Sequence, residues 1–147
     1  MGTNVFHELV ALLGGTRMLG ARPKSAREWH TVIAQGVPVR SAEVLKECLQ
    51  VSNALLAQLL GVSGKTLSRA RKAGANLNAV ASDRLFRVAR VTALAHQVFE
   101  SNEAAVSWLR RPQFGLDGQV PVDLLTTSAG MEEVERLLLR IEHGVYS

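Results

Sequence analysis

A short segment of this chain carries side chains that could bind a polyanion. Residues 63–74 read SGKTLSRARKAG, and at helical spacing Lys65, Arg69 and Lys72 share one face. Lysine and arginine donate hydrogen bonds to phosphate oxygens, and arginine also reaches guanine edges in the major groove of DNA. Glycine lets a backbone approach its ligand closely. The candidate DNA contacts are Ser63, Gly64, Lys65, Ser68, Arg69 and Lys72.

The residues before this segment indicate how it is positioned. An apolar helix is expected over 53–60, followed by Gly61 and a second helix over 64–73. Ala57 is small enough for two helices to touch, and Gly61 tolerates the positive φ of a sharp turn. Five residues are expected to face the core: Leu56, Leu60, Val62, Leu67 and Ala70. The pattern predicts a helix-turn-helix, with an αα-hairpin bearing a solvated basic face as the alternative.

Three arginines follow on the next helix, which is expected over 79–100. Arg84, Arg87 and Arg90 lie three residues apart and fall in one sector of that helix. They could contact backbone phosphate, or they could form the solvated face of a helix whose other side is apolar.

Composition limits the class of protein. The 147 residues are 47% hydrophobic and 20% charged, enough for a packed core. The net charge of +4 is uneven, because residues 1–100 carry +7 and residues 101–147 carry −3. The single Cys48 suits a reducing cytosol. Neither a membrane span nor a secretion signal is expected, so we predict a cytoplasmic protein.

Other chemistry finds little support. Gly64-Lys65-Thr66 resembles the end of a phosphate-binding loop, but that loop needs glycine where Leu59 stands. The four histidines and Cys48 lack metal-ligand spacing, and no nucleophile elbow occurs. We therefore expect no cofactor, no metal and no enzymatic activity.

Helical periodicity runs through the rest of the chain and predicts an all-α fold. Ser25 is a candidate N-cap with Glu28 at capping-box spacing, and Gly144 is placed to end the last helix. Residues 16–24 are expected to form a loop. The further expected helices are 6–13, 25–35, one from Ser41, one through Leu109, 121–125 and 129–143. We predict three regions: an N-terminal helical region (1–40), a helix-turn-helix domain (41–100) and a small helical domain (101–147).

The C-terminal region resembles a known family. The matching residues are Trp108-Leu109, Pro112, Leu116, Gly118, 121–125, Gly130, Val134, Leu138 and 140–146. In order and spacing they resemble the C-terminal toxin-binding domain of the Xre/MbcA/ParS-type antitoxins of bacterial toxin–antitoxin operons. With the helix-turn-helix, the resemblance covers about residues 50–147. Gln113, Asp117 and Val120 depart from the family pattern, which concerns loop detail.

The resemblance implies an antitoxin that neutralises a toxin encoded beside it, often a RES-domain enzyme that consumes NAD. It also implies repression of the operon through the helix-turn-helix, dimers or larger assemblies, and a C-terminal tail that reaches the toxin's active site. The residues themselves add that Leu139 widens the apolar stripe of the last helix although it stands among charged neighbours. The candidate toxin contacts are Leu139, Arg140, His143, Gly144, Val145, Tyr146 and Ser147.

Two other readings stay open at this stage. The chain could be a stand-alone helix-turn-helix regulator whose C-terminal part only dimerises. It could also be a protein-interaction module whose helix-turn-helix no longer binds DNA. The tail 145–147 could equally be a frayed terminus without a role.

Overall fold

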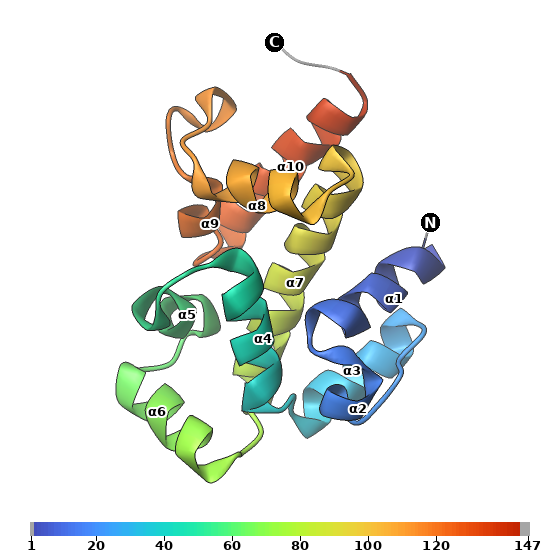
Figure 1. Ribbon diagram of the computed structural model, residues 1–147, viewed down its shortest axis with the longest axis vertical. Coiled ribbons are helices and arrows are strands. Elements are labelled where there is room, and N and C mark those ends of the chain that lie inside the picture. Colours follow the sequence, from blue (N-terminus) through green and yellow to red (C-terminus); the bar gives the residue numbers. More distant parts are fainter. Residues whose placement is uncertain (1, 145–147) are drawn as a thin grey trace. The chain divides into compact units, whose positions relative to one another are not determined.

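The protein is built of helices. The computed structural model describes the backbone of residues 2–144 and the side chains of residues 5–144. Within these residues no strand forms, and the all-α prediction is confirmed. The helices, drawn in Figure 1, are α1 (Gly2–Leu12), α2 (Gly15–Leu19), α3 (Ala26–Gln35), α4 (Val39–Leu49), α5 (Asn53–Leu60), α6 (Gly64–Ala73), α7 (Ala79–Phe99), α8 (Asn102–Arg110), the 3-10 turn η1 (Phe114–Leu116), α9 (Pro121–Leu124) and α10 (Ser128–Glu142).

The chain divides into two compact units. Unit 1 comprises Met1–Arg90 and unit 2 comprises Val91–Ser147, so the division falls inside α7. The three predicted regions, with boundaries after residues 40 and 100, differ from this division. Residues 1–40 share a unit with the helix-turn-helix. No helix within residues 2–144 has both the length and the apolarity needed to cross a bilayer.

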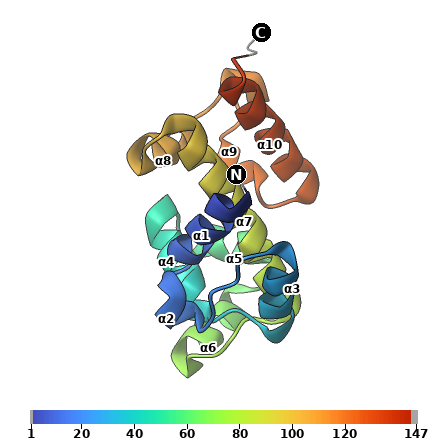
Figure 2. The same cartoon turned by 90° about the vertical axis from the view of Figure 1, so that its right-hand side faces the viewer.

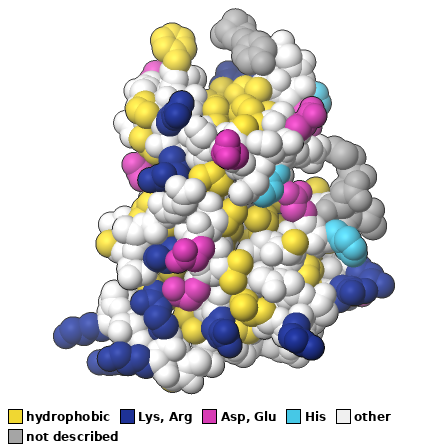
Figure 3. All heavy atoms as spheres, in the orientation of Figure 1, with side chains coloured by type: hydrophobic (Ala, Val, Ile, Leu, Met, Phe, Trp, Pro, Cys, Tyr) yellow, Lys and Arg dark blue, Asp and Glu magenta, His cyan; other side chains and the backbone are white. Residues whose placement is uncertain are grey.

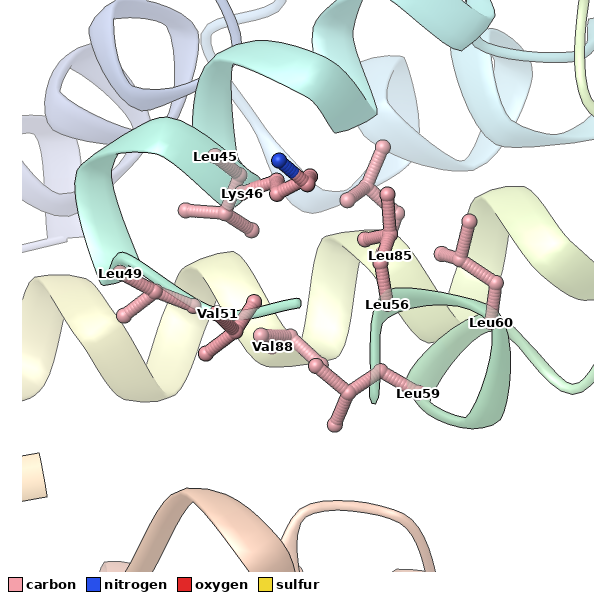
Figure 4. A pocket seen from close by; sticks show the side chains of 9 residues that line it. All are labelled: Leu45, Lys46, Leu49, Val51, Leu56, Leu59, Leu60, Leu85 and Val88. Atoms are coloured by element: carbon pink, nitrogen blue, oxygen red, sulfur yellow. The ribbon is translucent and has the colours of Figure 1, made fainter. Parts of the chain in front are cut away.

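The core of unit 1 lies between α4, α5 and the first part of α7. Figure 1 shows α1–α3 on one side of α4 and α5–α6 on the other. The residual space between α4, α5 and α7 is only about 10 Å³, too small for a ligand. It is lined by the side chains drawn in Figure 4: Leu45, Lys46, Leu49, Val51, Leu56, Leu59, Leu60, Leu85 and Val88.

The N-terminal helices belong to this core. Leu9 of α1 and Leu13, which follows this helix, are fully buried, and α1 packs against both α2 and α4. Trp29 of α3 is 1% exposed and its ring centroid lies 5.1 Å from that of Phe86 on α7. The predicted loop over 16–24 is wrong in its first part. The chain turns at the preceding glycines and forms the five-residue α2, which buries Leu19.

A strap of backbone hydrogen bonds closes the base of the helix-turn-helix. We use this name for residues 37–39 together with 75–77, which run antiparallel. Leu77 N donates to Val37 O at 2.8 Å, and Val39 N donates to Ala75 O at 3.0 Å. Val37 N donates to Oγ of the fully buried Ser82 at 2.8 Å. The segment from α4 to α6 is thereby held at both its ends.

Side-chain caps set several helix starts. Glu28 N donates to Ser25 Oγ at 3.1 Å, which confirms Ser25 as the N-cap of α3. The Glu28 carboxylate reaches back to Lys24 N at 2.8 Å rather than to the cap residue itself. The helix predicted from Ser41 begins two residues earlier at Val39, and Ser41 is fully buried.

Unit 2 is formed by the end of α7, α8, η1, α9 and α10. Leu109, Val134 and Leu138 are fully buried. Trp108 is half-buried, with its ring centroid 5.4 Å from that of Phe99. These contacts give unit 2 an apolar core of its own.

The connection from α9 to α10 leaves no space for a side chain at Gly130. Thr127 caps α10, since its Oγ1 accepts from Gly130 N at 3.0 Å. A Cβ at Gly130 would collide with the carbonyl oxygen of Leu124 at the end of α9. At the other end of α10, Gly144 has a φ of 72° and follows the helix as predicted.

Candidate functional site

The turn between α5 and α6 has the expected helix-turn-helix construction. Gly61 ends α5 with a φ of 71°, in the left-handed region that glycine adopts without strain. Val62 N then donates to Ala57 O at 3.0 Å, which closes the turn. Ala57 is buried, and so is Leu67 of α6, so the two helices meet over small and apolar side chains. The predicted motif is confirmed.

The second helix of the motif presents a basic face. Lys65, Arg69 and Lys72 are exposed, and Ser68 between them is half-buried. Figure 2 shows α6 at the end of unit 1, and in Figure 3 lysine and arginine side chains gather over this end. The arrangement supplies three exposed cations along one helix face, as a polyanion-binding surface requires.

Ser63 has a structural part to play at the start of α6. Its Oγ accepts from Thr66 N at 3.0 Å and donates to Thr66 Oγ1 at 3.0 Å. Ser63 is therefore the N-cap of α6, and its hydroxyl already has partners. Gly64, the first helical residue, is exposed, and a Cβ there would meet nothing within 4 Å. Gly64 could therefore contribute to the candidate surface through its accessible backbone.

One basic residue of α6 faces inward. Arg71 donates to Oε2 of Glu43 on α4 at 2.7 and 3.0 Å, and to Oδ1 of Asn53 on α5 at 3.1 Å. A planar guanidinium that donates from two nitrogens fixes its orientation relative to the carboxylate as well as the distance between them. This cluster fixes α6 to both preceding helices, and nothing local in the sequence identifies it.

The three arginines of α7 all have partners within unit 1. Arg84 lies over the turn, where a Cβ on Gly61 would come within 2.9 Å of its Nε. Arg87 pairs with Asp83 at 2.9 Å, and the Arg90 guanidinium carbon lies 5.9 Å from the centroid of the Phe86 ring. These contacts favour a packing role for Arg84, and Arg90 is the exposed member of the set.

The candidate toxin contacts lie at the end of α10. Met131, Val134 and Leu138 are buried, whereas Leu139 is 43% exposed. Arg140, His143 and Gly144 are also exposed. The remaining candidates, Val145, Tyr146 and Ser147, lie outside the described residues.

Sequence reasoning missed one exposed group. Phe114 of η1 is 99% exposed, although an aromatic side chain in a connecting segment ordinarily packs against its own domain. The following residues Gly115 and Leu116 line an open groove with side chains of α10. Solvent exposure at Phe114 depends on the course of the whole connection, so no local pattern could have revealed it.

In the described part of the chain, no three side chains of the types His, Cys, Asp and Glu converge on one point. The features that remain are a basic helix face in unit 1 and an apolar, partly charged surface in unit 2.

Comparison with protein families assigns both units. The model described as "Antitoxin Xre-like helix-turn-helix domain" matches residues 28–90, and the model described as "Antitoxin Xre/MbcA/ParS C-terminal toxin-binding domain" matches residues 94–144. Fold and matches thus define a helix-turn-helix domain joined to a toxin-binding domain. The matched region starts within α3, about twenty residues before the resemblance visible in the sequence.

Individual relatives agree with this assignment. An "Antitoxin Xre" from Pseudomonas putida is 44% identical over 63 residues, which is 43% of this chain and 40% of that protein. An "Antitoxin Xre" from Photorhabdus laumondii is 26% identical over 89% of both chains. A "Prs ADP-ribosylating antitoxin" from a Sphingobium species is 26% identical over 79% of both. The chain belongs to the Xre-type antitoxin family, which confirms the resemblance seen in the sequence.

Proposed function

We propose that this chain is a cytoplasmic antitoxin that neutralises a RES-domain toxin through unit 2 and represses its own operon through α6. The observation that carries the proposal is the pairing of an exposed basic helix-turn-helix with a domain of the toxin-binding family in one chain. A single protein can then hold the toxin inactive and limit synthesis of the pair.

Repression would use α6 as the recognition helix. Its exposed Lys65, Arg69 and Lys72 supply phosphate and base-edge donors, and its first turn supplies free backbone N–H groups at Gly64. The Arg71–Glu43 contact keeps the helix in a fixed orientation, which base reading needs. Helix-turn-helix proteins commonly read two half-sites as dimers, so we propose a homodimer on the operator.

Neutralisation would use the exposed end of α10 and the residues that follow it. Leu139, Arg140 and His143 lie on this end, and all three are exposed. In the proposed complex Val145, Tyr146 and Ser147 enter the toxin's NAD site, where an aromatic ring with a hydroxyl can meet both apolar and polar groups.

A growth and reporter assay tests both activities together. The gene that lies beside this one is expressed from an inducible promoter, alone or with the full chain, and a reporter follows the operon's own promoter. Rescued growth with reduced reporter output is expected. A chain that lacks residues 145–147 should still repress the reporter but rescue growth poorly. Full rescue by the truncated chain would remove the tail from the mechanism, and no rescue by the intact chain would refute the antitoxin activity.

A further inference from the structure

The feature with no role so far is the exposed ring of Phe114. Among the described side chains, three large hydrophobic residues are exposed: Val80 at 69%, Phe114 at 99% and Leu139 at 43%. Two of the three belong to unit 2, and both are in the region matched by the toxin-binding family. An aromatic ring kept fully in water gains nothing for folding, so its use lies outside this chain as described.

The backbone that carries the ring is held by several hydrogen bonds. Gln113 N donates to Gln119 O at 3.0 Å, and Gly118 N donates to Gln113 O at 2.9 Å, which closes a tight loop around η1. The side-chain nitrogen of Gln113 also donates to Trp108 O at 2.9 Å, which ties the loop to α8. Because the loop is already ordered in the free protein, binding of a partner to the ring costs little conformational entropy of the loop.

The next two residues of η1 fix the loop against α10. Leu116 is 4% exposed, and a Cβ at Gly115 would come within 2.8 Å of Leu137 Cδ1. The 3-10 turn therefore sits directly on the last helix. Phe114, at the start of this turn, is therefore attached to backbone that packs against α10.

A groove opens between the turn and α10. It has a volume of about 390 Å³ and is lined by Gly115, Leu116, Glu133, Arg136, Leu139 and Arg140. Its floor is apolar, while its rim carries two guanidinium groups and one carboxylate. Arg136 keeps a long ion pair with Glu132 at 3.5 Å, and within the described residues no ion pair or side-chain hydrogen bond involves Arg140.

We propose that Phe114 and this groove form the docking surface for the toxin. The Phe114 ring enters an apolar pocket of the toxin, an apolar toxin side chain fills the groove beside Leu139, and acidic toxin groups face Arg136 and Arg140. The inference rests on the proposed function. Aromatic and arginine side chains dominate the energetics of such protein interfaces.

Two observations favour the toxin over a second copy of this chain. Every lining residue lies within the region matched by the toxin-binding family, residues 94–144. The groove also includes Leu139 and Arg140, two of the candidate toxin contacts.

The test measures toxin affinity for surface variants of the full chain. Calorimetry with the toxin from the adjacent gene compares wild type, Phe114→Ser, Leu139→Ser and the control Val80→Ser, which removes an exposed apolar group from unit 1. Loss of a central aromatic anchor should raise Kd by about thirty-fold or more, and Val80→Ser should leave it unchanged. Reversal of both Arg136 and Arg140 to glutamate should also weaken binding by at least about ten-fold.

The outcomes separate the two proposals. If the wild-type chain does not bind the toxin, the proposed function falls and the docking surface with it. If wild type binds and Phe114→Ser and the double arginine reversal bind equally well, the docking surface alone is refuted. Sedimentation of the same variants identifies the other occupant, because loss of self-association with unchanged toxin affinity would assign the groove to a second copy. Should Phe114→Ser fail to fold, Leu139→Ser and the arginine reversal decide the question.

Discussion

The exposed face of α6 and the exposed surface around η1 are made of opposite kinds of side chain. On α6 the cations Lys65, Arg69 and Lys72 are outside and the apolar Leu67 is buried. Around η1 the aromatic ring of Phe114 is in solvent instead. A polyanion is attracted by charge at a distance, while a folded partner gains affinity chiefly from desolvated apolar and aromatic groups. Each surface is therefore suited to one of the two partners.

Gly130→Ala is expected to have the largest effect, because it should impair the function of unit 2 and leave that of unit 1 intact. The added methyl group would collide with the Leu124 carbonyl at the α9–α10 connection, and backbone on both sides leaves it no room. Thermal unfolding should show unit 2 destabilised by about 3 kcal/mol, and toxin capture should be lost while operator binding persists. Gly64→Ala, at an exposed helical site with no neighbour within 4 Å, is the control and should not destabilise the protein. Normal toxin capture by Gly130→Ala would contradict the tight packing at this connection.

Gly61→Val is the reciprocal change in unit 1. A β-branched residue at φ 71° is strained, and its Cβ would also displace Arg84, so we expect a loss of about 2–3 kcal/mol. Operator binding in a gel-shift titration should disappear, and toxin affinity should stay normal. Gly74→Val shares the positive φ but has open space, so it should cost only the backbone part, about 1–2 kcal/mol. Equal effects of the two variants would show that the Arg84 contact is irrelevant.

Arg69→Ala tests whether the α6 face reads bases. A groove contact predicts about 1–3 kcal/mol weaker binding to the operator, with relaxed preference for sequence. Lys72→Ala, as a phosphate contact, should weaken all sequences alike and reduce the salt slope by about one. Fluorescence anisotropy at two salt concentrations, with operator and scrambled DNA, distinguishes the two. Operator affinity unchanged by Arg69→Ala would exclude this residue from the interface.

The smallest effect is expected from Arg71→Ala, which frees α6 from α4 and α5. A half-exposed, two-nitrogen ion pair contributes about 1 kcal/mol, so unit 1 should unfold at slightly lower temperature. Operator affinity should fall because the helix is less well held, without a change in base preference. A double-mutant cycle with Glu43→Ala isolates the pair, and a coupling energy near zero would show that the contact does not orient α6.

Sequence could predict the elements whose signals are local. The helix-turn-helix was accessible because Ala57, Gly61 and Leu67 each satisfy a positional requirement within a dozen residues. The N-cap at Ser25 uses a side chain that bonds to the backbone three residues along. A helix of five residues such as α2 is too short to show a repeating apolar pattern, so the sequence predicts a loop for its segment.

The features that escaped prediction depend on distant residues. In the sequence, Arg71 cannot be distinguished from the other cations of its segment. Its structural role follows only from the fold, which brings Glu43, 28 residues earlier, beside it. Phe114 is exposed while its neighbours Leu116 and Gly115 lie against α10, an arrangement that depends on residues more than twenty positions away. The same limit applies to the groove, whose two walls come from η1 and α10.

The strap at the base of the helix-turn-helix has a consequence for motion. A rigid-body movement of the segment from α4 to α6 must break the hydrogen bonds of Val39 to Ala75 and of Leu77 to Val37. It would also disturb the buried hydrogen bond of Val37 to Ser82. These amide hydrogens should exchange with deuterium only when unit 1 opens cooperatively. By contrast, the exposed first-turn amides of α6, such as that of Gly64, have no helical partner and should exchange freely. The first turn of α6 would thus stay available to DNA, while the hydrogen bonds of the strap would be the last to open.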